Sequence, residues 1–147
     1  MIAAMSQSEK ILLQNVLAGR GYSMTKARQI VFDLLNTPEP QSMAELTKKA
    51  VGKLDRASVY RNISLFEELG IVHRIYIGWK YKLELSDSFL AHHHHLSCLR
   101  CGKVVDIHDD ALVDEFIAKV TRQFGFTPKR HQLEVDGVCA DCQKKYA

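Results

Sequence analysis

The feature that most constrains this chain is a repeated cysteine pair. Cys98 and Cys101 form one C-x-x-C motif, and Cys139 and Cys142 repeat the spacing after 37 intervening residues, which uses every cysteine in the sequence. One C-x-x-C turn supplies two thiolates to a tetrahedral ion, and a second turn completes the four ligands of a closed site. The pattern therefore predicts a structural zinc site. Two disulfides in an exported protein are the alternative.

The composition is that of an ordinary globular protein. The chain has 147 residues, of which 46% are apolar and 25% are charged. Its N-terminus lacks an apolar signal core with a basic flank, and no segment approaches the roughly 18 consecutive apolar residues of a membrane span. We therefore expect a cytoplasmic protein. In that reducing compartment paired cysteines are more often metal ligands than disulfides.

The excess positive charge lies in the first part of the chain. Residues 1–90 contain 12 Lys and Arg against 9 Asp and Glu, whereas residues 91–147 contain 8 of each. A polyanionic partner would therefore meet the first part.

That first part reads as four helices followed by a β-hairpin. Capping-box sequences at Ser6–Glu9 and Ser42–Glu45 predict two helix starts. A helix between them should begin at Thr25 and end before Pro38. The strands 71–77 and 80–85 are joined at Gly78 and Trp79, which predicts a tight hairpin. We expect Trp79 to pack against the protein, with a nucleic-acid contact as the alternative.

The fourth helix, from Asp55 to Gly70, is the most informative element. At about 100° per residue, Val59, Ile63 and Phe66 share an apolar side. The opposite side carries Ala57, Tyr60, Arg61 and Ser64. This front suits DNA reading, although a solvated face remains the alternative. Short helices that end in such a helix and a two-stranded wing predict a winged helix-turn-helix domain.

The second part should be a small α/β domain. After a hinge at residues 86–91 we expect strands at 95–99, 103–107 and 132–138, and a helix from Asp109 or Asp110 to Phe124. A domain this small buries little surface by itself. We therefore expect both zinc and a partner subunit to stabilise it.

The segments HHHHLSCLRCGKVVDI, RASVYRNISLFEELGIV and CADC closely resemble the ferric uptake regulator superfamily of metal-dependent transcription factors. The resemblance spans nearly the whole chain. It implies an α+β protein with a winged-helix DNA-binding domain (1–85), a hinge (86–91) and a dimerisation and metal-binding domain (92–147). It also implies a homodimer, which could form a tetramer on a palindromic AT-rich operator in double-stranded DNA.

The resemblance also assigns residues. The structural zinc would be held by Cys98, Cys101, Cys139 and Cys142. DNA would be contacted by Lys26, Arg28, Ser58, Tyr60 and Arg61. A regulatory ion at the hinge would be held by Glu84, His93, His95 and Asp106. An additional site would use His92, His94 and His131, with Asp114 or Glu115 as a carboxylate.

Two positions depart from the family pattern. Many members have a histidine where this chain has Gln41, and many have an aspartate in place of His94.

Imidazole and carboxylate ligands without a thiolate suit Fe(II), Mn(II) or Zn(II). Zinc sensors of the family often recruit a cysteine, and none is spare here. Residue 106 is Asp, which is similar to the peroxide-sensing branch, whereas iron sensors commonly have Glu at this position. We therefore expect an iron-dependent repressor first, a peroxide sensor that uses iron second, and a zinc or manganese sensor third.

Two other function classes remain open. The histidine cluster could be the open metal site of a hydrolase or lyase, although no substrate-pocket motif accompanies it. A constitutive zinc-ribbon protein that binds nucleic acid without sensing is the other class.

Overall fold

The computed structural model describes residues 5–108 and 111–145, which fall into two compact units. The first unit ends at Ala91 and the second begins at His92. The expected start of a helix at Asp109 or Asp110 lies outside the described residues. Among the described helices none has the length and apolar character needed to cross a membrane.

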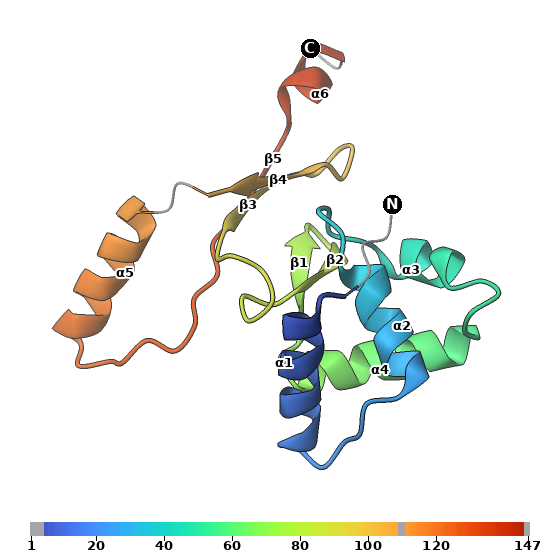
Figure 1. Ribbon diagram of the computed structural model, residues 1–147. Helices are drawn as coiled ribbons and strands as arrows, with labels where there is room; N and C mark the ends of the chain where they lie inside the picture. The colour runs from blue at the N-terminus through green and yellow to red at the C-terminus, as the bar shows by residue number, and fades with distance from the viewer. Residues whose placement is uncertain (1–4, 109–110, 146–147) are drawn as a thin grey trace. The chain divides into compact units, whose positions relative to one another are not determined.

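The first unit has the order expected for a winged helix (Figure 1). Its elements are α1 (Gln7–Ala18), α2 (Lys26–Leu35), α3 (Met43–Lys49), α4 (Arg56–Glu68), β1 (Val72–Ile77) and β2 (Lys80–Leu85). The strands β1 and β2 pair antiparallel across the turn at Gly78 and Trp79. This arrangement confirms the four helices and the hairpin.

Each helix of the first unit begins at a polar cap. The side chains of Ser6, Thr25, Ser42 and Asp55 each accept a hydrogen bond from the backbone N–H three residues further on. Such caps satisfy an N–H group that has no partner within its own helix. They fix where each helix starts and therefore which side chains face the core.

The core of the first unit joins all its elements. Phe32 and Phe66 are fully buried, and they share one cluster with side chains from each of the other helices and from the hairpin: Leu13, Leu17, Leu46, Val72, Leu83 and Leu85. The expected hinge residues also contribute, because the rings of Phe89 and Phe32 lie 5.0 Å apart, edge to face. Residues 86–91 therefore pack within the first unit.

The second unit is a three-stranded sheet with two helices. Its elements are β3 (His94–Cys98), β4 (Val104–Ile107), α5 (Ala111–Gln123), β5 (Glu134–Gly137) and α6 (Ala140–Lys145). The strand β3 is central, antiparallel to β4 and parallel to β5. The last strand is shorter than the expected range 132–138, and α6 was not predicted.

This second unit buries few apolar side chains, as its small size predicted. Within its described residues the only buried hydrophobic side chains are those of Cys98 and Cys142. Helix α5 has no buried residue and stands away from the strands of its own unit (Figure 1). Its apolar stripe is exposed, with Leu112 at 82% and Phe116 at 63%. A single chain therefore leaves this helix without a packed face.

Candidate functional site

The four cysteines come together at one end of the second unit. One ligand atom from each of Cys98, Cys101, Cys139 and Cys142 lies within 4.8 Å of the others. Cys98 ends β3, Cys101 lies in the following turn, and Cys139 and Cys142 flank the start of α6. The helix that sequence reasoning missed thus presents the second cysteine pair.

The sulfur spacing fits zinc. Cys101 Sγ and Cys139 Sγ are 3.8 Å apart, which is close to the separation of about 3.8 Å that a tetrahedral ion with Zn–S bonds of about 2.3 Å imposes. A disulfide requires about 2.05 Å, and all four cysteines are free thiols. The donor set and its geometry therefore fit a four-thiolate zinc site.

Hydrogen bonding and burial shift the pKa values of two of these thiols in opposite directions. The N–H of Cys139 donates to Cys98 Sγ at 3.3 Å, and this hydrogen bond is the main reason that the pKa of Cys98 falls to about 6. Burial, reinforced by the neighbouring thiols, raises the pKa of Cys142 to about 12. Zinc binds the thiolate form, so the N–H of Cys139 favours the ligand state of Cys98.

A second cluster surrounds the start of β3. The rings of His93 and His95 lie 4.7 Å apart. The pairing of β3 with β4 sets His95 opposite Asp106, whose Oδ1 is 3.9 Å from His95 Nε2. Three of the four residues expected at the hinge site therefore gather in the second unit. His108 also lies close, with its ring 5.5 Å from that of His93.

The fourth residue, Glu84, belongs to the first unit. It is buried on β2, and the residue opposite it on β1 in the strand register is His73. Burial of a carboxylate requires ion pairing or hydrogen bonding to offset its lost hydration.

Gln41 is held by the first unit. Its backbone N–H donates to the Leu83 carbonyl at 3.0 Å. Its side-chain amide donates to the Leu34 carbonyl at 2.6 Å and to Thr37 Oγ1 at 2.8 Å. Its amide oxygen accepts a hydrogen bond from the Lys49 ammonium. These contacts give Gln41 a structural role, which its sequence position alone did not indicate.

The other histidines form a third cluster. His92, His94 and His131 offer ring nitrogens that lie within 4.8 Å of one another. His92 Nε2 and His131 Nε2 are 3.0 Å apart, and Asp114 Oδ1 lies 3.5 Å from His131 Nε2. Of the two carboxylates that the sequence left open, Asp114 therefore lies beside the imidazoles. This donor set suits a borderline divalent ion.

Helix α4 presents the expected two sides. Val59, Ile63 and Phe66 are buried, whereas Tyr60 and Arg61 are exposed. The exposed front confirms the periodicity argument and leaves DNA contact as a prediction.

Polar contacts order the start of this front. Asp55 Oδ2 accepts a hydrogen bond from Ser58 Oγ at 2.7 Å, and Ser58 Oγ accepts one from the Arg61 guanidinium at 3.1 Å. The Ser58 hydroxyl and backbone N–H keep the pKa of Asp55 below its ordinary value. Arg61 is thus presented on a surface that is already ordered.

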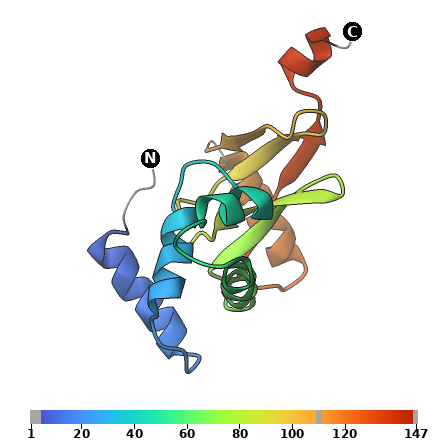
Figure 2. The ribbon, with the colours of Figure 1, turned by 90° about the vertical axis from the view of Figure 1, so that its right-hand side faces the viewer.

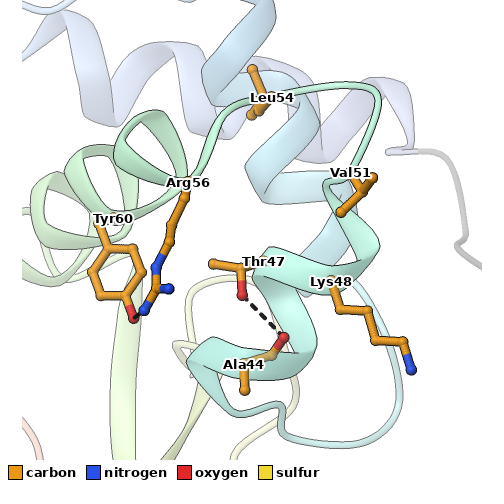
Figure 3. Close-up of a pocket in the computed structure, with 7 residues that line it drawn as sticks. All are labelled: Ala44, Thr47, Lys48, Val51, Leu54, Arg56 and Tyr60. Atoms are coloured by element: carbon orange, nitrogen blue, oxygen red, sulfur yellow. Dashed lines mark hydrogen bonds between the residues drawn. The ribbon is translucent and has the colours of Figure 1, made fainter.

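A pocket of about 420 Å³ lies between α3 and α4 (Figure 3). Its lining includes Lys48, Arg56 and Tyr60, and neither Asp nor Glu is among the lining residues. Arg56 reaches along α4, with its guanidinium 5.4 Å from the centre of the Tyr60 ring and 3.4 Å from the hydroxyl. Arg56 was not among the predicted contacts, and its one-turn spacing from Tyr60 is the signal that could have found it.

The two residues expected from the second helix differ in their surroundings. Lys26 is exposed at the start of α2. Arg28 donates to the Ser23 carbonyl and lies 5.4 Å from the Tyr22 ring centre. Arg28 therefore also fastens the turn before α2.

Comparison with known proteins decides the family. The model of the ferric uptake regulator family matches residues 19–136. The chain belongs to this family. The match includes α4, the hairpin and the histidine-rich strand.

Relatives and solved structures agree with this ferric uptake regulator assignment. A peroxide operon regulator from Bacillus subtilis is 33% identical over 134 residues, covering 85% of this chain and 87% of the relative. A ferric uptake regulation protein from Vibrio parahaemolyticus is 33% identical over 131 residues, covering 85% and 86%. The crystal structure of the Vibrio cholerae ferric uptake regulator matches with a TM-score of 0.69 and 28% identity, covering 86% of this chain and 99% of that one.

Family membership establishes the broad function. The ferric uptake regulator family consists of metal-responsive transcriptional regulators that bind DNA and act as dimers, and the chain is one of them. It is not an enzyme, so the hydrolase hypothesis is wrong. The α+β fold, with a winged helix and a four-cysteine dimerisation domain, is confirmed.

Proposed function

We propose that the protein is a repressor whose affinity for DNA is set by a regulatory ion held by Glu84, His93, His95 and Asp106. The distance of 3.9 Å between His95 and Asp106 carries this proposal, since it unites an imidazole and a carboxylate on paired strands. The 4.7 Å spacing of the His93 and His95 rings supports it. An ion there would supply a cross-link that fixes the pose of the DNA-binding units.

The reading surface of this proposal is the front of α4. Ser58, Tyr60 and Arg61 would contact base edges and phosphates in the major groove, and Lys26 and Arg28 would contact the backbone. The operator would be a palindrome, because a two-fold dimer reads two equivalent half-sites, and the family resemblance implies that it is AT-rich. Assembly into a tetramer on DNA belongs to the same proposal.

The dimer would form through the second unit. Leu112 and Phe116 on α5 are exposed in the single chain, as are Leu96, Val105 and Val135 on the sheet. Covering such apolar surface is what stabilises a permanent dimer. The four cysteines would hold a structural zinc ion, and His92, His94, Asp114 and His131 would hold an additional ion.

For the sensed metal we rank iron first. The names of the two relatives divide between ferric uptake and peroxide regulation, and the imidazole–carboxylate donor set suits Fe(II). An iron-dependent peroxide sensor is the second candidate, since residue 106 is Asp, as in the peroxide-sensing branch, where iron sensors commonly have Glu. Zinc or manganese sensing follows. A cytoplasmic location is part of the proposal, because a reducing compartment keeps the thiols available to zinc.

The experiment measures DNA binding of the dimer with Fe(II), Mn(II) or Zn(II) and after mild chelation that leaves the cysteine-bound zinc in place. The duplex would be selected by the metal-loaded protein from a randomised pool. We expect metal to tighten binding by at least about ten-fold, and His93→Ala to remove this dependence while zinc is retained. Equal affinity with and without metal would instead support a constitutive zinc-ribbon binder.

Peroxide sensing needs a separate measurement. If the iron-loaded protein is a peroxide sensor, low peroxide should add oxygen mass to His93 or to another histidine of the hinge site. If the mass does not change and the DNA affinity still depends on Fe(II), the protein senses iron and not peroxide.

A further inference from the structure

The tip of the β1–β2 hairpin carries an exposed tryptophan. Trp79 is 88% exposed, so the expectation that it packs against the protein is wrong. Gly78 adopts φ 61°, a conformation that suits the first central position of a two-residue hairpin turn. The next residue is then placed at the tip, and Figure 2 shows the hairpin projecting beyond the helices of its own unit.

The tip is cationic. The Lys80 ammonium lies 4.9 Å from the centre of the Trp79 ring. From Leu69 to Leu83 the sequence contains Arg74, Lys80 and Lys82 and no acidic residue. Indole beside ammonium combines an apolar stacking surface with a phosphate-binding charge.

The hairpin is also fastened to α4. The Arg74 guanidinium forms an ion pair with Glu67 in the last turn of α4. The same guanidinium covers the Tyr81 ring at 4.2 Å from its centre, and Tyr81 lies across the hairpin from Tyr76. A tip held in this way keeps a fixed position relative to Tyr60 and Arg61, because all these residues belong to one unit.

We propose that Trp79 and Lys80 form a second DNA contact, in which the indole packs on the sugars and base edges beside the segment read by α4 and the ammonium pairs with a phosphate. The inference rests on the proposed reading role of α4. Duplex DNA is favoured as the occupant because the aromatic surface is surrounded by cations and shares a rigid unit with the reading helix. An apolar protein partner would not require these charges.

Trp79 is the only tryptophan in the chain, so its emission reports on the tip alone. The dimer, loaded with zinc and with manganese, is titrated with the selected duplex. We expect the emission to change on binding, and quenching by acrylamide to fall at least about two-fold in the complex. Emission and quenching that stay constant while the complex forms would overturn the proposal.

Two substitutions separate the indole from the ammonium. Trp79→Ala should weaken binding about ten-fold, which corresponds to the loss of about 1.4 kcal/mol of apolar burial on the duplex, and should leave the salt dependence unchanged. Trp79→Phe should recover part of the loss. Lys80→Gln should reduce the slope of log affinity against log salt by about 1. Both side chains are exposed, so the fold should survive.

Matched controls complete the design. Ile11→Ala removes an exposed apolar side chain of the same unit, and Lys144→Gln removes an exposed charge of the other unit; both should bind as the parent does. A shorter duplex that lacks the flank next to the segment read by α4 should bind Trp79→Ala and the parent with equal affinity. A difference that persists on the trimmed duplex would overturn the placement. Failure of the parent to bind any selected duplex would refute the proposed function itself.

Discussion

At the scale of single residues, function depends on how each polar side chain is restrained. Arg61 is exposed, but its guanidinium is already bonded to Ser58, which is bonded to Asp55. The Cys98 thiol is ordered in a similar way, because it accepts a hydrogen bond from the backbone N–H of Cys139. Preorganised groups lose less conformational entropy when they bind DNA or metal.

Replacing Arg61 by alanine should weaken operator binding at every salt concentration. An arginine that reads a guanine contributes about 1–3 kcal/mol of discrimination, so specificity should relax at one base position. Fluorescence anisotropy with parent and substituted operators measures both effects. Arg20→Ala, an exposed arginine after α1, is the control. Loss of the dimer in Arg61→Ala would show that this side of α4 is structural.

Replacing Cys101 by serine should release the zinc. Cys101 is exposed, so the change perturbs packing little and acts through the lost thiolate. We expect the zinc content to fall by about one ion per chain, with a lower Tm for the second unit. Mass spectrometry under native conditions and calorimetry make the measurement. A zinc-free variant that remains a stable dimer would contradict the structural role.

At the scale of elements, caps and the core determine the winged helix. Ser42 and Glu45 form a reciprocal capping box at the start of α3, and Phe66 fastens the back of α4. The position of α4 is therefore fixed independently of its exposed front. This separation leaves the front available for the residues that we propose contact DNA.

The capping box predicts a pH effect. The backbone N–H of Ser42, then its hydroxyl, lowers the pKa of Glu45 below 4.5. A lowered carboxyl pKa stabilises the fold above the unfolded-state value, and the stabilisation disappears as pH falls through the folded-state value. Glu45→Gln, which keeps a hydrogen-bond acceptor, should lower the free energy of unfolding by about 0.3–1 kcal/mol at pH 7. At a pH below the folded-state pKa of Glu45, the substitution should have no effect. Urea unfolding across pH, with Glu68→Gln as control, tests this.

The core predicts a larger effect. Phe66→Ala should reduce the free energy of unfolding of the first unit by about 3–5 kcal/mol, because it leaves a cavity as well as removing apolar burial. Chemical denaturation followed by circular dichroism measures the loss. The zinc content should not change, since the cysteines belong to the other unit. A loss below about 1 kcal/mol would indicate that the core around α4 is loosely packed.

At the scale of the whole molecule, the second unit requires a partner. Among its described residues, only two cysteines and a few polar side chains, His94 and His95 among them, are buried. Its exposed apolar side chains lie on α5 and on the sheet. The dimer is therefore part of the fold of this unit, and in the proposed function it is also the basis for reading a palindrome.

Placing a charge on the apolar stripe should dissociate the dimer. Phe116→Glu puts a carboxylate where we expect the partner chain, and burial of an unpaired charge costs several kcal/mol. Sedimentation should show monomers at micromolar concentration. Ala118→Glu, on the opposite side of α5, adds the same charge and should leave the dimer intact. A dimeric Phe116→Glu would place the interface elsewhere.

The local features of this protein follow from short stretches of its sequence. Ser42 and Asp55 predicted helix starts, the spacing of Val59, Ile63 and Phe66 predicted the buried side of α4, and Gly78 predicted the turn, because caps, periodicity and turns depend on neighbouring residues. The two C-x-x-C motifs predicted the zinc site, since four thiolates have few other uses in a reducing compartment.

Which distant groups meet depends on how the chain packs. The pairing of β3 with β4 brought Asp106 to His95. The residues just before β3 and β5 bring His92 and His131 together, although they are 39 positions apart in the sequence. Trp79 was misjudged because aromatic residues are usually buried, whereas its exposure depends on how far the hairpin extends from the core. Strand pairing and the exposure of a hairpin tip depend on how the whole chain packs, so the residues next to His95 or Trp79 do not determine them.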